Sequence, residues 1–261
     1  MEDKTTEKLA EAFHELDNCV AVAVSGSRTS RIHDSLSDWD IYVYREGTID
    51  RQVREEILSA ISDSHLVGSS FFEEGDEFIR DGVYYDVMYR DPEFIRQQID
   101  RVWVNHQCSL GYTTCFLHNL KTSSFIFDKT GISDYISVLD GPYPDGLSEA
   151  IIDNNLRMIC GSSEGSWMAQ VTSAVRRGDF VSRNHRLAAL MASYFDIIFA
   201  HNKVLHPGEK KLIRYCHLLC SELPENFDED MERIYSSAYE GDLPAALTAA
   251  LGRLKDLVRR T

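Results

Sequence analysis

The hydrophobic positions in the first 90 residues of the chain alternate between two periods. Apolar residues recur every three or four positions over 5–17 and again over 50–61, and this spacing predicts amphipathic helices. Short apolar runs rich in β-branched and aromatic residues predict strands at 20–24, 41–44, 66–72 and 83–89. Helices that alternate with strands in this way predict a small domain built on one sheet.

From about residue 92 onward the pattern is mainly helical. Residues 182–202 place apolar side chains on one face at helical spacing. Pro207 is expected to begin the next helix, because a proline at the first helical position costs no hydrogen bond. A last helix is expected over 244–258, where leucines recur at the same spacing.

Residues 140–147 contain two prolines and two glycines and form the clearest loop of the chain. The fold class expected is therefore α+β. A small mixed-sheet domain is expected over 1–92, with an alternative boundary near 140. A mainly helical bundle domain is expected over 93–261.

Composition and charge limit the partners of the protein. Of its 261 residues, 43% are hydrophobic and 26% charged, as in folded globular proteins. The formal net charge of −15 repels a phosphate backbone, so a long nucleic acid is not expected as the main substrate, whereas metal ions and cationic small molecules are attracted. No apolar run is long enough to span a bilayer, and the acidic N-terminus does not resemble a secretion signal. We therefore expect a cytoplasmic protein with no membrane partner.

Two aspartates, Asp38 and Asp40, open the strand predicted at 41–44. Because successive strand side chains point to opposite faces, the two carboxylates share one face. Carboxylates held this close repel each other unless a cation lies between them. Magnesium is the cation we expect, because it takes oxygen ligands and is often shared between a few carboxylates and substrate phosphates.

The turn before these aspartates has the features of a phosphate-binding segment. Gly26 follows a predicted strand and lets the backbone approach a phosphate without a Cβ clash, and Ser27 offers an N–H and a hydroxyl. Arg28 and Arg31 are candidates to neutralise phosphate charge. Ser37, directly before the aspartate pair, completes the nucleotide-binding candidates of this segment.

Together these motifs resemble those of the DNA polymerase beta-like nucleotidyltransferase superfamily. That family carries Gly-Ser at a strand end, then Asp-x-Asp opening an apolar strand, and a third carboxylate on a later strand, which Asp86 matches in type and position. The resemblance covers roughly the first third of the chain. It implies that Asp38, Asp40 and Asp86 hold two Mg²⁺ ions during transfer of a nucleotidyl group from a nucleoside triphosphate. Asp86 is then a metal ligand, a general base for the acceptor hydroxyl, or both.

The helical half carries a second resemblance. Asn202, Pro207 and Lys210 match the Asn-x-x-x-x-Pro-x-x-Lys stretch in the helical domain of aminoglycoside-type adenylyltransferases. In that family the lysine helps to hold the nucleotide phosphates, so Lys210 is the candidate here and Lys211 is the alternative. No glutamate of the sequence clearly matches the separate catalytic base of the antibiotic-modifying members, which leaves the acceptor open.

Three functions are compatible with these residues. The first is transfer of AMP from ATP to a hydroxyl of a small molecule, for which the acidic charge favours a cationic, aminoglycoside-like acceptor. The second is AMP transfer to a protein or a tRNA end, as in toxin–antitoxin members of the superfamily. The third is a nucleotide-binding regulator without turnover, which the presence of all three motif carboxylates disfavours. ATP is preferred over other nucleotides by resemblance alone.

Overall fold

A computed structural model describes residues 3–29, 38–69, 74–239 and 241–259. The chain divides into two compact units. The sheet unit comprises residues 1–100 and 119–141, and the helical unit comprises residues 101–118 and 142–261. One unit is built on a sheet and the other on helices, which confirms the α+β class.

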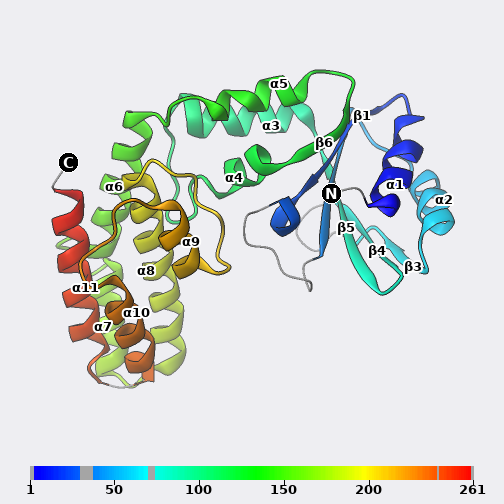
Figure 1. Cartoon of the computed structure of the whole chain (residues 1–261). Helices are drawn as coiled ribbons and strands as arrows, with labels where there is room; N and C mark the ends of the chain where they lie inside the picture. The colour runs from blue at the N-terminus through cyan, green and yellow to red at the C-terminus, as the bar shows by residue number, and fades with distance from the viewer. Residues whose placement is uncertain (1–2, 30–37, 70–73, 240, 260–261) are drawn as a thin grey trace. The chain divides into compact units, whose positions relative to one another are not determined.

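Among the described residues, six strands form one sheet in the order β3-β4-β5-β2-β1-β6 (Figure 1). β2 and β5 run parallel and the other neighbours run antiparallel, so the sheet is mixed, as expected. The strands are β1 (Cys19–Ser25), β2 (Trp39–Arg45), β3 (Ser64–Val67), β4 (Gly75–Arg80), β5 (Val83–Arg90) and β6 (Ser124–Asp128). The helices are α1 (Lys4–His14), α2 (Arg51–Ile61), α3 (Pro92–Ile99), α5 (Ile132–Ile136) and the end of α4 (Cys115–Thr122).

The two faces of this sheet differ in burial. α1 and α2 lie side by side over one face (Figure 1), where Phe13 and Leu58 pack with strand residues such as Ile41. On β5, Val87 is fully buried toward these helices, whereas Asp86 beside it is half-buried on the opposite face. We call the opposite face the carboxylate face. Burial of apolar side chains on the helix-covered face therefore fixes which residues the carboxylate face presents.

Helices make up most of the helical unit. They are α6 (Asp145–Cys160), α7 (Trp167–Arg176), α8 (Phe180–His201), α9 (Leu212–Leu219), α10 (Phe227–Ser236) and α11 (Leu243–Val258). α8 is buried along most of its second half and packs against both α6 and α7. The helices predicted at 182–202 and 244–258 are α8 and α11, and both are confirmed. No helix in the described ranges is long and apolar enough to cross a membrane.

A buried polar network fastens α8 to the segment that precedes α4. The Asp196 carboxylate, 1% exposed, accepts hydrogen bonds from the Thr113 N–H (3.1 Å), the Thr113 hydroxyl (2.7 Å) and the Asn155 amide (3.1 Å). Asn155 in turn accepts the Gly111 N–H at 3.1 Å. Burial raises the pKa of Asp196 to about 6, because desolvation of the carboxylate outweighs these three hydrogen bonds.

The structure contains two strands that the sequence pattern does not predict, β4 and β6. In β4 the alternation is hidden because Asp76 occupies a fully buried position. Its carboxylate is satisfied there by Arg54 (3.2 Å) and by the Tyr89 hydroxyl (2.6 Å). β6 is a short edge strand that pairs with β1 although it follows four intervening strands in the chain. Residues 70–72 of the predicted third strand lie outside the described residues, and β3 ends at Val67.

The prediction that Pro207 begins a helix is wrong. α9 begins at Leu212, after a segment in which Gly208 and Lys211 both have positive φ (103° and 57°). A positive φ is incompatible with a continuous right-handed helix. The Gly208 N–H also donates to the His206 ring at 3.0 Å, so this part of the chain is held as a turn.

Candidate active site

Asp40 and Asp86 are direct partners on the neighbouring parallel strands β2 and β5. Because paired residues of adjacent strands share one face, both carboxylates lie on the carboxylate face. Neighbouring strands are about 4.8 Å apart, which places the two acidic side chains next to each other. Two of the three predicted carboxylates are thus brought together by strand pairing.

Asp38 precedes the first residue of β2 and is exposed. Tyr84 shows which residues lie around Asp38. It is on the same face of β5 as Asp86. The pKa of the Tyr84 hydroxyl is raised by burial, by a hydrogen bond with Glu77 and by the negative charges of Glu77, Asp86 and Asp38. Asp38 therefore belongs to the same acidic neighbourhood as the strand pair.

Glu77 on β4 is a fourth carboxylate of this site, and no motif of the sequence points to it. It is the direct antiparallel partner of Asp86, so Glu77, Asp86 and Asp40 form one row across three adjacent strands. On the opposite face Phe78 stacks on Tyr85, with ring centroids 4.5 Å apart. Because successive strand side chains alternate, the inward position of Phe78 makes Glu77 point outward with Asp86. This assignment depends on β4, which the sequence pattern does not predict.

Gly26 leaves the room that the Asp40 carboxylate occupies. A Cβ at position 26 would lie 1.7 Å from Asp40 Oδ2, and the residue has a φ of +69°. Position 26 therefore requires glycine for two reasons, conformation and space. The strand end before it is anchored, because the Ser25 hydroxyl donates to the Asn119 carbonyl (3.1 Å) and accepts from the Ser123 hydroxyl (3.0 Å). The turn thus positions Asp40. The contact of Gly26 and Ser27 with a phosphate stays a prediction.

The remaining candidates of the turn are only partly within the described residues. Ser27 and Arg28 lie in the short 3₁₀ helix Gly26–Thr29, and the Ser27 side chain is not described. The Arg28 guanidinium lies 4.8 Å from the centre of the Trp39 ring, a cation–π arrangement on the side of β2 opposite to Asp40. Arg31 and Ser37 lie outside the described residues.

Lys210 and Lys211 belong to the helical unit, in the segment between α8 and α9. Both are exposed. The segment before them is anchored by His206, a fully buried residue whose backbone N–H donates to the Thr114 hydroxyl at 2.8 Å. Burial and the nearby His118 lower the pKa of His206 to about 3, so the ring is neutral. The sequence analysis passed over His206, because a buried histidine next to a proline carries no distinctive pattern.

Asn202, which carried part of the resemblance, has a structural role here. Its side-chain amide donates to the carbonyls of Ile198 (2.9 Å) and Glu222 (2.8 Å), and its oxygen accepts the Glu222 N–H at 2.9 Å. These bonds cap the end of α8 and tie it to the loop after α9. Asn202 therefore sets where the lysine segment leaves the helix.

The acidic row fits magnesium in chemistry and in number of ligands. Within the described residues, no three His, Cys, Asp or Glu side chains are gathered as a ready-made metal site. Asp38, Asp40 and Asp86 are thus not assembled as one three-carboxylate cluster. Magnesium is usually bound by one or two carboxylates together with waters and substrate phosphates. The paired oxygens of Asp40 and Asp86 match that requirement.

No protein-family model matches the chain, and no curated protein matches its sequence. Among solved structures, it is similar to a nucleotidyltransferase-like protein from Exiguobacterium sibiricum 255-15, with a TM-score of 0.46 and 11% identity over 98% of this chain and 74% of that one. It is also similar to spectinomycin adenyltransferase AAD(9) from Enterococcus faecialis with ATP and spectinomycin, with a TM-score of 0.32 and 12% identity over 97% of this chain and 98% of that one. At these TM-scores the likenesses carry no argument about this chain.

Proposed function

We propose that the protein is a metal-dependent nucleotidyltransferase that transfers AMP from ATP to a hydroxyl group of a small molecule. The observation that carries this proposal is the pairing of Asp40 with Asp86 beside the Gly26 turn. Two adjacent carboxylates on a half-exposed sheet face are costly unless a cation joins them. A triphosphate brings the anionic oxygens that complete the coordination of that cation.

In the proposed reaction the acceptor hydroxyl oxygen bonds to the α-phosphorus, and the bond from that phosphorus to the bridging oxygen breaks. Pyrophosphate leaves, and the hydroxyl proton passes to a base, for which Asp86 is the candidate. Asp40 and Asp86 would hold magnesium, with Asp38 as a further candidate ligand. When bound, magnesium offsets the negative charge of the triphosphate and of the leaving group. A second ion is proposed from the family resemblance alone.

Nucleotide binding is assigned to the Gly26–Ser27 turn, with Arg28, Arg31 and Ser37 nearby in the sequence, and to Lys210 or Lys211. Of these, Arg28 would have to leave the Trp39 ring to reach a nucleotide on the carboxylate face. The exposed lysines of the α8–α9 segment suit phosphate oxygens, because an ammonium is a flexible cation with three donors. ATP is preferred here on the resemblance.

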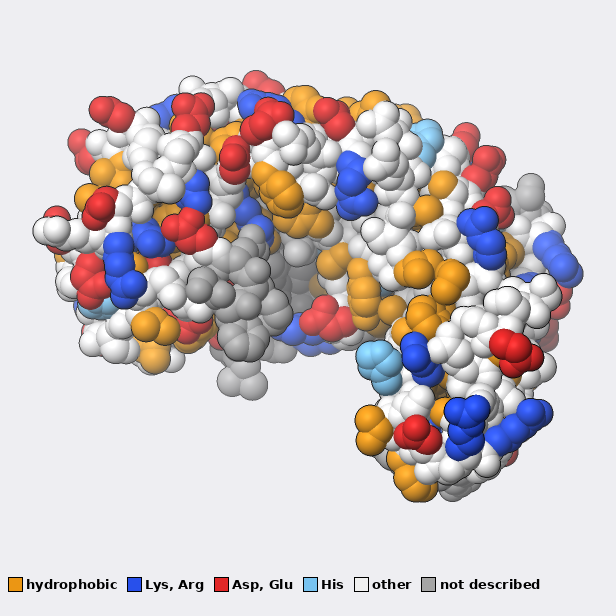
Figure 2. Space-filling model, turned by 180° about the vertical axis from the view of Figure 1, so that it is seen from behind, with side chains coloured by type: hydrophobic (Ala, Val, Ile, Leu, Met, Phe, Trp, Pro, Cys, Tyr) orange, Lys and Arg blue, Asp and Glu red, His pale blue; other side chains and the backbone are white. Residues whose placement is uncertain are grey.

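A cationic small molecule is the proposed acceptor class. The net charge of −15 favours the approach of cations and disfavours polyanions. On the face drawn in Figure 2, the coloured Lys and Arg side chains are scattered among Asp and Glu and do not follow one continuous track. A continuous basic track is what a long nucleic acid requires. An amine-bearing polyol of the aminoglycoside type is a cationic small molecule and carries the hydroxyl groups that the reaction requires.

The proposal is tested with ATP labelled at the α-phosphate. The full chain is incubated with magnesium and, separately, with a panel of aminoglycosides, with total tRNA and with cell protein. Label on a small molecule is the expected result, and label on protein or tRNA would favour the second function. Magnesium-dependent binding of ATP in a thermal-shift assay, without label transfer to any class, would favour a regulator.

A further inference from the structure

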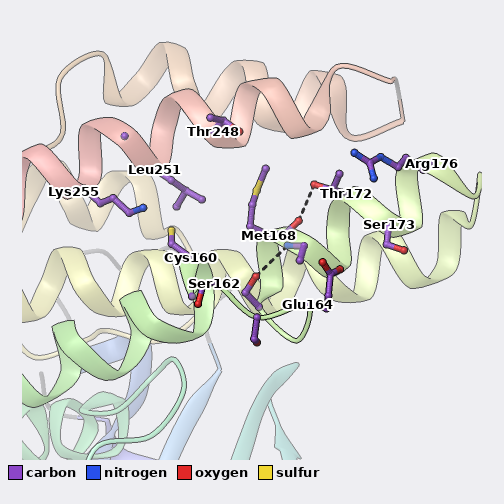
Figure 3. Close-up of a pocket in the computed structure, with 15 residues that line it drawn as sticks. Cys160, Ser162, Glu164, Met168, Thr172, Ser173, Arg176, Thr248, Leu251 and Lys255 are labelled. Carbon is purple, nitrogen blue, oxygen red and sulfur yellow. Dashed lines mark hydrogen bonds between the residues drawn. The ribbon is translucent and has the colours of Figure 1, made fainter.

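The helical unit contains a cavity of about 640 Å³ that the proposed reaction does not use. Its walls come from the end of α6, the loop 161–166, α7 and α11 (Figure 3). The volume lies in the range of pockets that bind small molecules. All the residues that line it belong to the helical unit, so it is independent of the carboxylate row on the sheet.

Two basic side chains mark the ends of this cavity. In Figure 3, Lys255 of α11 lies at one end and Arg176 of α7 at the other, with Met168 and Leu251 between them. Neither cation has an ion-pair partner among the described residues. Glu164 is the single acidic residue in the lining. In a chain with a net charge of −15, two such cations around one cavity indicate a site for an anion.

Hydroxyl groups supply the remaining polar surface of the cavity. Ser162, Ser163, Ser173 and Thr248 all line it, and a hydroxyl both donates and accepts hydrogen bonds. The N-terminus of α7 also borders the cavity, and the Ser166 hydroxyl caps it by accepting the Ala169 N–H at 3.3 Å. The positive end of a helix favours an anionic group nearby. Between Lys255 and Arg176 the lining thus contains hydroxyl-bearing side chains as well as the apolar Met168 and Leu251 (Figure 3).

Gly252 of α11 leaves open space beside the helix backbone at the edge of the cavity. It lies in the interior of α11, where glycine is the least favourable residue after proline. A Cβ at this position would meet no atom within 4 Å, so packing within the chain does not require glycine there. Its φ is not positive either. A molecule in the cavity therefore has room to lie against the helix backbone, where a Cβ would take part of its space.

We propose that this cavity binds a small elongated dianion, with one anionic group at Lys255, the other at Arg176 and an apolar spacer against Met168 and Leu251. The shared chemistry is a pair of terminal carboxylates or a pair of terminal phosphates. A single anionic group satisfies only one of the two cations, so the site discriminates against monoanions of the same length. This binding site goes beyond the proposed transfer reaction.

The proposal is tested by calorimetric titration of the full chain. The probes are aliphatic dicarboxylates from succinate to sebacate, the matched monocarboxylates, and 1,6-hexanediol bisphosphate. At least one dianion is expected to bind about tenfold or more tightly than its matched monoanion, and the two dianion series show which terminal group is preferred. Loss of a charge-assisted hydrogen bond typically lowers affinity by about tenfold or more. We therefore expect Arg176→Gln and Lys255→Gln each to lower the affinity for the dianion by about this factor. Arg177→Gln is the matched control, because Arg177 directly follows Arg176 in the chain and does not line the cavity.

Two further measurements locate the bound molecule. Cys160 lines the cavity, so a saturating dianion is expected to slow its alkylation by iodoacetamide, followed on the Cys160 peptide by mass spectrometry. Gly252→Ala is expected to raise the Tm of the free protein, since alanine favours the helix, and to weaken dianion binding. The proposal is overturned if no dianion binds at millimolar concentration, if matched monoanions bind equally well, or if both cation substitutions leave the affinity unchanged.

Discussion

Asp40 and Asp86 face each other across a parallel strand pair, one on β2 and one on β5. Parallel neighbours require a crossover connection, and here α2, β3 and β4 lie between the two strands in the chain. The distance between the two carboxylates is therefore set by the sheet and not by a local loop. A site built on paired strands is rigid, as the alignment of a metal ion with a triphosphate requires.

Replacing either member of this pair should stop nucleotidyl transfer. Asp40→Asn and Asp86→Asn keep the size of the side chain and remove one negative charge from the metal position. We expect turnover to fall by about a thousandfold or more, as when an essential electrostatic group is removed. Circular dichroism and Tm are expected to stay close to those of the wild type, because both side chains are only half-buried.

Gly26→Ala should lower both stability and activity, because the new methyl group competes with the Asp40 carboxylate. Gly47→Ala is the matched control. Gly47 has a similar φ of +71°, and a Cβ there would meet nothing within 4 Å. The control is expected to lose about 1 kcal/mol from its strained backbone alone, with normal turnover. Equal losses in urea unfolding and in turnover for the two variants would show that Asp40 is not positioned by Gly26.

Glu77→Gln should weaken magnesium binding without abolishing the reaction. The substitution keeps a hydrogen-bond acceptor for Tyr84 and removes the negative charge beside Asp86. We expect the magnesium concentration for half-maximal activity to rise severalfold, while the rate at saturating magnesium changes little. Glu46→Gln, an exposed glutamate at the far end of β2, serves as control. If the magnesium dependence of Glu77→Gln were unchanged, Glu77 would have no part in magnesium binding and would be an ordinary surface residue.

Lys210→Gln and Lys211→Gln separate the two candidates for the phosphate contact. Loss of a charge-assisted contact typically costs about 1.5–3 kcal/mol, so the substitution at the contacting lysine should raise KM for ATP by about tenfold or more. The substitution at the other lysine should leave KM nearly unchanged, and each variant is thus a control for its neighbour. Normal KM values in both variants would remove this segment from the nucleotide site.

The stability of the protein should depend on the protonation of Asp196. Its pKa is raised from 3.8 to about 6, so the folded state binds this proton more tightly than the unfolded state. The resulting stabilisation is fully present below pH 3.8 and is lost as the pH rises through 6. This rise in the pKa of Asp196 corresponds to roughly 3 kcal/mol. The unfolding free energy of the wild type relative to Asp196→Asn should therefore fall between pH 4 and pH 7.

The comparison with Asp196→Asn is needed because His206 acts in the opposite direction. Its pKa is lowered from 6.5 to about 3, so its contribution to stability is present above pH 6.5 and is lost as the pH falls through 3. Both proteins in the comparison contain His206, and its effect cancels in the difference. A difference that is constant from pH 4 to pH 7 would contradict the raised pKa of Asp196.

The sequence predicts those parts of the fold whose residues carry a local signal. β1, β2, β5, α8 and α11 are marked by apolar periodicity, and the α+β class follows from their order. β4 escapes prediction because Asp76 is buried through partners on α2 and β5 that are distant in sequence. The prediction for Pro207 is wrong because the chain forms a turn at Gly208, although proline is common at the start of helices.

The candidate site divides in the same way. Asp38 and Asp40 are recognisable because their chemistry is local in sequence, and Asp86 because it lies in an apolar strand. Glu77 joins them only through the pairing of β4 with β5, and no local pattern contains that information. The contact of Gly26 with Asp40 is likewise a tertiary relationship. Strand pairing thus adds the residues that spacing alone does not reveal.

The central claim is that Asp40 and Asp86 together support nucleotidyl transfer. Its most direct test is the transfer of α-phosphate label from ATP to a panel of aminoglycosides, measured with and without magnesium for the wild type, Asp40→Asn and Asp86→Asn. The account predicts magnesium-dependent labelling by the wild type and none above background by either variant. Labelling by both variants at the rate of the wild type would contradict it.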